Sequence, residues 1–257
     1  MSQRSPLVSS PARLLFSALL LVGLCGCQTT GLEDVTGALG ASSEKTRSAE
    51  ARPDLEALRE RYRAKPGDPA VALQYGSALR DSGQLAQAVA VLEQAVLTHS
   101  SSKALLGAYG RALADSGNFQ QAFDVLSRAH TPEDPDWHIL SAQGAVLDQL
   151  GRHEEAQQYY ASAFKIVPDE PSVLSNLGLS YVLENNLPKA EDTLRRALER
   201  APSNPRVRAN LALVVGLQGH QAEAENIVKA DLPPDEAQAK VTALRQLLTK
   251  KQQRAEK

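Results

Sequence analysis

Small and apolar residues recur along most of this chain with a period of thirty-four residues, and the period is clearest between Pro171 and Asn204. This stretch reads PSVLSNLGLSYVLENNLPKAEDTLRRALERAPSN. Its pattern predicts two antiparallel helices on either side of a turn at Asn185. Two helices approach closely only where small residues meet, so we expect Gly178 to face Ala190. The space around that contact is expected to be filled by Tyr181, Leu194 and Ala197.

The same residue types return at the same positions in five consecutive units. The eighth position reads Gly76, Gly110, Gly144, Gly178 and Ala212. The twentieth reads Ala88, Ala122, Ala156, Ala190 and Ala224. The turn position reads Gly83, Gly117, Gly151, Asn185 and Gly219, which suits a helix end that needs a left-handed backbone. The twenty-seventh is alanine in four units and fails at Asp231. Five tandem copies favour a repeat array over a helical bundle with coincidental alanines.

A helix–turn–helix unit of this length, with small residues at these positions, resembles the tetratricopeptide repeat. The resemblance implies an all-α fold. It implies a right-handed superhelical solenoid of helix–turn–helix repeats with a C-terminal capping helix, in which first helices line the concave side. The solenoid is expected over residues 53–251. Its five repeats are expected at 69–102, 103–136, 137–170, 171–204 and 205–238.

Both ends of such a solenoid need caps, because each repeat buries its apolar face only against its neighbours. Residues 53–65 predict one amphipathic helix, with Leu55, Leu58 and Tyr62 on a single face. We interpret residues 53–68 as a half-repeat that caps the N-terminal end. A capping helix is expected over residues 235–251 after two prolines, with three apolar residues facing inward: Val241, Leu244 and Leu248.

The first 26 residues differ from the repeats and predict a leader for export. Arg4 and Arg13 form a positively charged region before an apolar run. This run is too short to span a bilayer. The run ends Leu24-Cys25-Gly26-Cys27, which resembles the lipobox of bacterial lipoproteins. That resemblance implies a lipoprotein signal peptide over residues 1–26 and lipid attachment at Cys27. A plain secretory signal that happens to contain cysteine is the alternative.

The segment after the leader, residues 27–52, is rich in Gly, Ala, Ser, Thr and charge and shows no helical stripe. It predicts a lipidated, flexible tether. The residue after the cysteine is Gln28 rather than aspartate, and by the same resemblance this implies sorting to the outer membrane. We therefore expect a lipid-anchored protein on the periplasmic face of the outer membrane.

Composition and motifs argue against catalysis and against nucleic-acid binding. The formal net charge is −2 and no basic stripe occurs, so nucleic acid is not an expected partner. Both cysteines lie in the leader and lipobox, which excludes a disulfide or a cysteine metal site in the solenoid. The five histidines share no metal-ligand spacing, and neither a phosphate loop nor a Gly-x-Ser-x-Gly motif is present. We expect a protein-binding scaffold without enzymatic activity, metal or cofactor.

A binding site is expected on the concave side, which in tetratricopeptide proteins is lined by six positions of each first helix. In the first two repeats these positions are polar and include Gln74, Ser77, Arg80, Asp81, Arg111 and Asp115. In the fourth and fifth repeats they predict a peptide-binding groove made of Ser175, Asn176, Leu179, Leu183, Arg206, Asn210, Leu213 and Leu217. Apolar residues that no core requires favour docking of a helix or strand, and asparagine amides can bind any peptide backbone. The alternative is that Leu179 and Leu213 pack between helices.

One part of the chain resembles a narrower family. The runs SNLGLSYVLENNLPKAEDTLRRA, ANLALVVGLQG and DLPPDEAQAKVTALRQLL are similar to the TadD family, tetratricopeptide lipoproteins of the tight-adherence (Flp) pilus system. This resemblance implies a pilotin-like factor that assembles or localises the outer-membrane secretin of the pilus, with that secretin or another pilus assembly component as partner. Two alternatives remain. One is another envelope assembly adaptor, such as a type IV pilus pilotin or a barrel-assembly lipoprotein, and the other is an adaptor for peptidoglycan hydrolases.

Overall fold

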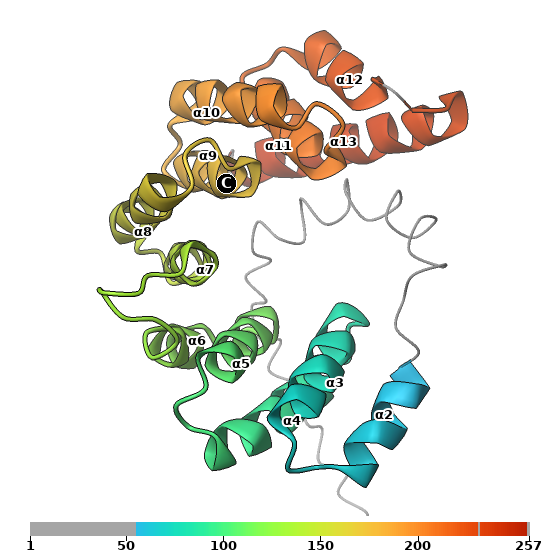
Figure 1. Ribbon diagram of the computed structural model, residues 1–257. Coiled ribbons are helices and arrows are strands. Elements are labelled where there is room, and N and C mark those ends of the chain that lie inside the picture. Colours follow the sequence, from blue (N-terminus) through green and yellow to red (C-terminus); the bar gives the residue numbers. More distant parts are fainter. Residues whose placement is uncertain (1–54, 231, 256–257) are drawn as a thin grey trace, which may run out of the picture. The chain divides into compact units, whose positions relative to one another are not determined.

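The computed structural model describes residues 55–230 and 232–255, and this part contains twelve helices and no strand (Figure 1). The expected signal peptide, the lipid attachment at Cys27 and the tether lie outside the described residues. The helices are α2 (Leu55–Ala64), α3 (Pro69–Asp81), α4 (Leu85–Thr98), α5 (Lys103–Asp115), α6 (Phe119–Leu126), α7 (Trp137–Gln149), α8 (His153–Ile166), α9 (Pro171–Leu183), α10 (Leu187–Arg200), α11 (Pro205–Leu217), α12 (Gln221–Lys229) and α13 (Pro234–Ala255).

The helices pack as successive pairs. Within each expected repeat the first helix contacts the second, and each second helix contacts the first helix of the next repeat. The first helices α3, α5, α7, α9, α11 and α13 also contact one another in chain order, while α2 packs on α3. The predicted all-α solenoid of tetratricopeptide helix pairs is therefore confirmed.

The turns between paired helices have the left-handed backbone that the sequence predicted. The φ angle is +78° at Gly83, +82° at Gly117, +75° at Gly151 and +91° at Gly219. Asn185 takes the same conformation with a φ of +59°. Glycine adopts this region without a steric cost, and asparagine is among the few other residues that visit it.

The start of each first helix is fixed by a polar residue that the repeat pattern did not single out. Each of these residues accepts a hydrogen bond from the backbone of the following helix: Asp68, Ser102, Asp136, Glu170 and Asn204. Such caps satisfy backbone donors that have no partner inside the helix. They define where each repeat begins.

The close contact inside the third and fourth pairs is made by a large side chain of the second helix. A Cβ added to Gly178 would lie 2.6 Å from Cγ of Leu194, and one added to Gly144 would lie 2.7 Å from Cε1 of Tyr160. The nearest atoms thus belong to the residue at the twenty-fourth position, and Leu194 was expected to fill the space around the contact of Gly178 with Ala190. The large side chain of the second helix fills the notch that the glycine leaves, as ridges fill grooves between helices.

The last helix is longer than expected, because α13 runs from Pro234 to Ala255 rather than over residues 235–251. Its inward residues Val241, Leu244 and Leu248 are buried, as predicted. They join a hydrophobic cluster with residues of α11, including Leu211 and Leu213. This packing covers the end of the fifth repeat.

Candidate functional site

Three residues of the predicted groove are buried rather than exposed. Asn210 and Leu213 have no exposed surface, and Ser175 is 2% exposed. The side-chain amide of Asn210 donates a hydrogen bond to Oγ of Ser175 at 2.8 Å. The Asn210 amide, which we expected to bind a peptide backbone, is therefore bonded inside the protein. The first helices α9, α11 and α13 pack directly on one another, and this contact encloses the sixth and ninth positions of the fifth repeat.

The same bond occurs one repeat earlier. Asn176 is half-buried, and its amide donates to Oγ of Ser141 at 3.1 Å. Asparagine at the sixth position of one repeat thus binds serine at the fifth position of the repeat before it. These two bonds form a ladder across α7, α9 and α11, which we call the asparagine ladder. Each amide joins neighbouring repeats through one of its N–H groups, and the amide of Asn210 has no exposed surface for a peptide backbone.

The other predicted groove residues remain accessible in part. Leu179, Leu183 and Leu217 are half-buried, and Arg206 is exposed in the first turn of α11. The structure therefore separates the predicted set into a buried part (Ser175, Asn210 and Leu213) and a part that is at least partly accessible. The accessible part includes an apolar strip on α9 and the end of α11.

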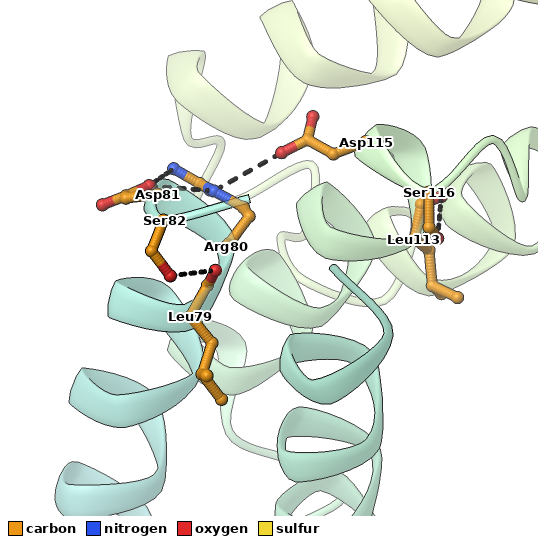
Figure 2. A network of polar contacts seen from close by, with 7 residues as sticks. All are labelled: Leu79, Arg80, Asp81, Ser82, Leu113, Asp115 and Ser116. Carbon is orange, nitrogen blue, oxygen red and sulfur yellow. Dashed lines mark hydrogen bonds and ion pairs between the residues drawn. The ribbon is translucent and has the colours of Figure 1, made fainter. Parts of the chain in front are cut away.

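The polar half of the first helices carries a charged network that links two repeats. Nη2 of Arg80 lies 2.8 Å from Oδ1 of Asp81, and Nε of Arg80 lies 3.5 Å from Oδ2 of Asp115 on the next first helix (Figure 2). Two serines at equivalent positions close the ends of these helices, since Oγ of Ser82 and Oγ of Ser116 each donate to a carbonyl at 2.9 Å. The last turns that hold Asp81 and Asp115 are thereby fixed.

Arg111 lies on the same surface. It is half-buried, and burial together with the nearby Arg80 lowers its pKa, whereas Asp136, Asp115 and Asp81 act in the opposite direction. Both signs of charge therefore face one another here. A surface of this kind selects partners by complementary charge more than it adds affinity.

A buried polar cluster lies between the third and fourth repeats, and the sequence pattern did not single it out. The Asp148 carboxylate accepts bonds from His153, Tyr160 and Ser180. His153 is one of the five histidines that share no metal-ligand spacing, and its contact here is with Asp148. The signal that could have found the cluster is that polar residues stand at repeat positions that are apolar in most other units.

The described residues include no group of three or more His, Cys, Asp or Glu side chains that could hold a metal ion. None of the described helices is long and apolar enough to span a membrane. The described residues form stacked helix pairs with a partly apolar, partly charged surface on the first helices. This arrangement is suited to binding a protein segment.

Comparison with known proteins places the chain in a family. A profile of the tetratricopeptide repeat matches residues 79–144 and 149–214, slightly more than half of the sequence, and the chain belongs to that family. The two matched segments run from the end of α3 through most of α11. The protein is a tetratricopeptide scaffold suited to protein binding. A comparison with curated proteins gave no match.

Several solved structures are similar. A tetratricopeptide repeat protein from Parabacteroides merdae has a TM-score of 0.61 and 17% identity, over 86% of this chain and 86% of that one. TTC0263, a thermophilic TPR protein in Thermus thermophilus, has a TM-score of 0.58 and 20% identity, over 71% of this chain and 98% of that one. MamA from Desulfovibrio magneticus, residues 41 to the end, has a TM-score of 0.50 and 17% identity, over 76% of this chain and 98% of that one. At such identities the likeness shows the fold alone.

Proposed function

We propose that this protein is a lipid-anchored scaffold on the periplasmic face of the outer membrane that helps the secretin of a tight-adherence pilus to assemble or localise. The observation that carries this proposal is the resemblance to the TadD family, which covers roughly residues 70–250 and is most specific from Pro171 to Leu248, that is, from the start of α9 into α13. The Leu-Cys-Gly-Cys run at residues 24–27 supports the anchor. Membership of the tetratricopeptide repeat family supports a protein partner.

The part of the surface that would receive the partner is the partly exposed apolar strip of α9. Leu179 and Leu183 lie on one helix at a spacing of four, so their side chains share a face. Both are half-buried, and leucines of this kind bury more surface when a partner helix or strand covers them. The asparagine ladder joins α9, which carries this strip, to α7 and to α11.

The test is the amount of pilus secretin in the outer membrane of a strain that encodes the pilus. Deletion of the gene is expected to reduce the assembled secretin multimer, and re-expression of the wild type is expected to restore it. Cys27→Ala is expected not to restore it, because a protein without acyl chains loses firm membrane attachment. Cys25→Ala serves as the matched control and is expected to behave as the wild type.

The proposal fails if secretin multimers form at the wild-type level in the deletion strain. It also fails if the gene lies among barrel-assembly genes and no secretin, secretion ATPase or small pilin is encoded beside it. A protein that fractionates with the outer membrane despite Cys27→Ala contradicts the anchor but leaves the scaffold role intact.

A further inference from the structure

Arg111 is a half-buried arginine of α5 whose guanidinium makes no hydrogen bond and no ion pair within the described part of the chain. A Cβ added to Gly107, one turn earlier on α5, would lie 3.6 Å from Nη1 and 3.8 Å from Nη2 of Arg111. The same point would lie 2.7 Å from Cδ1 of Ile139 on α7. The guanidinium therefore folds back along α5 to the place where α5 meets α7.

Three carboxylates act on Arg111 through space, and each of them is engaged by another group. Asp81 and Asp115 both face Arg80 (Figure 2). Asp136 accepts a backbone hydrogen bond at the start of α7. Burial and the positive charge of Arg80 lower the pKa of Arg111, while the three carboxylates act against this. Within residues 55–230 and 232–255, the donors of this guanidinium are therefore unused, and burying such a group is costly until a partner completes its bonds.

The repeat pattern sets this place apart from the other junctions. The ninth position of the five repeats reads Ser77, Arg111, Ala145, Leu179 and Leu213, so a charge occurs there once. The positions that form the asparagine ladder elsewhere are Gly107 and Ala142 at this junction, and these residues have no side-chain donor or acceptor. Ala142 and Ala145 are half-buried on α7 and end at Cβ. A partner chain can therefore approach α7 closely beside the arginine.

We propose that Arg111 binds one carboxylate side chain from an acidic segment of a partner protein, at the surface where α5 and α7 meet. A guanidinium presents parallel N–H donors that match the two oxygens of a carboxylate. The site favours a single negative charge over a phosphate dianion, because Asp81, Asp115 and Asp136 repel additional negative charge. The surface of the first helices thus has a charged contact in addition to the apolar strip.

The position of Arg111 also predicts where the acidic residue lies in the partner segment. Arg111, Ala145 and Leu179 occupy the same repeat position on α5, α7 and α9, and these three helices contact one another in order. Packed helices lie about 8–10 Å apart, so two steps span about 16–20 Å. An extended segment covers that length in about five or six residues. This spacing rests on the proposed binding strip of α9, whereas the contact with Arg111 does not depend on the pilus secretin.

The test is a selection of random twelve-residue peptides displayed on phage, carried out on the full chain and on Arg111→Gln. Peptides selected by the wild type are expected to be enriched in Asp or Glu at one position, about five or six residues from an apolar pair. Those selected by Arg111→Gln are expected to keep the apolar pair and to lose the acidic residue. A wild-type selection without acidic enrichment, or one that yields no binding peptide, overturns the proposal.

Dissociation constants of the most enriched peptide measure the contact itself. Replacing its acidic residue by the corresponding amide is expected to weaken binding to the wild type about tenfold and binding to Arg111→Gln hardly at all. Arg111→Lys keeps the charge but loses the parallel donors, so it is expected to retain part of the preference. A phosphoserine in place of the acidic residue is expected to bind more weakly, and equal or tighter binding would contradict a site for a single charge.

Arg63→Gln is the matched control, because it removes the same charge from the chain. Arg63 is 62% exposed on α2 and pairs with Glu60. This variant is expected to select and bind the same peptides as the wild type, and an equal loss of the acidic preference would show that net charge, not Arg111, is responsible. If Arg111→Gln does not fold, the amide-for-acid change in the peptide still decides the matter on the wild type. No secretin is used, so failure here leaves the proposed pilus role untouched.

Discussion

Asn210 donates its side-chain amide to Ser175, thirty-five residues earlier, in a site with no exposed surface at the asparagine. Its Oδ1 atom is buried and has no hydrogen-bond partner within the described residues. A buried polar group held by one bond is a structural element of the repeat junction rather than a free ligand contact. The residue that the repeat pattern presented as a binding donor thus helps to hold the fifth repeat on the fourth.

Asn210→Ala is therefore expected to lower the free energy of unfolding by about 1–3 kcal/mol, because Ser175 loses its donor in a buried site. Asn176→Ala removes the equivalent bond to Ser141, but Asn176 is only half-buried and water can replace the amide. Its cost is expected to be smaller. Chemical denaturation of the two variants measures the difference, and equal stability of wild type and Asn210→Ala would contradict the ladder.

Gly144→Leu tests the packing inside a repeat. A Cβ at this position would already lie 2.7 Å from the ring of Tyr160, so a larger side chain forces the pair of helices apart. Overpacking of this kind costs about 1–3 kcal/mol. Glu154→Gln, an exposed change on the paired helix, is expected to stay within about 0.5 kcal/mol. The same melting temperature for both variants would show that the helices do not meet at Gly144.

The turn residues predict opposite effects of two simple substitutions. Gly151 has a φ of +75°, and a Cβ there carries a backbone cost of about 1–2 kcal/mol, so Gly151→Ala is expected to destabilise the protein. Asn185 occupies the same turn position with a φ of +59°. Asn185→Gly is expected to leave stability unchanged or to raise it. Thermal melting separates these outcomes, and a neutral Gly151→Ala would be inconsistent with the left-handed turn.

Tyr109 provides a prediction at alkaline pH. Burial and the nearby Glu93 raise its pKa to about 12 from the ordinary value of 10.0. The folded chain therefore keeps this proton where the unfolded chain has lost it, and stability falls as pH rises through this range. Tyr109→Phe cannot titrate and is expected to lose less stability than the wild type above pH 10.0. Denaturation at several alkaline pH values measures the two slopes, and identical slopes would refute the assignment.

The sequence predicted the fold well, because the period and the turn residues are local. Glycine at a turn position indicates a left-handed backbone, and alanine in a second helix indicates close packing. Both features lie within one repeat. The burial of Asn210 and Leu213 could not be predicted in this way, because a repeat position specifies a face of a helix but not how closely the next first helix approaches. Asp148 was missed for a related reason. Its partners lie on three different helices, and their polarity becomes informative only when equivalent positions of all repeats are compared.

The central claim is that the apolar strip on α9 binds the pilus secretin, and the most direct measurement is the affinity of this chain for the periplasmic part of that secretin. The double variant Leu179→Ser with Leu183→Ser is expected to weaken binding tenfold or more. Each tenfold change in the dissociation constant corresponds to about 1.4 kcal/mol of binding free energy. Leu97→Ser is the control, since Leu97 is 72% exposed and lies on α4, which is a second helix. It is expected to bind as the wild type does. Equal affinity of all three proteins, with melting temperatures that show each to be folded, would contradict the account.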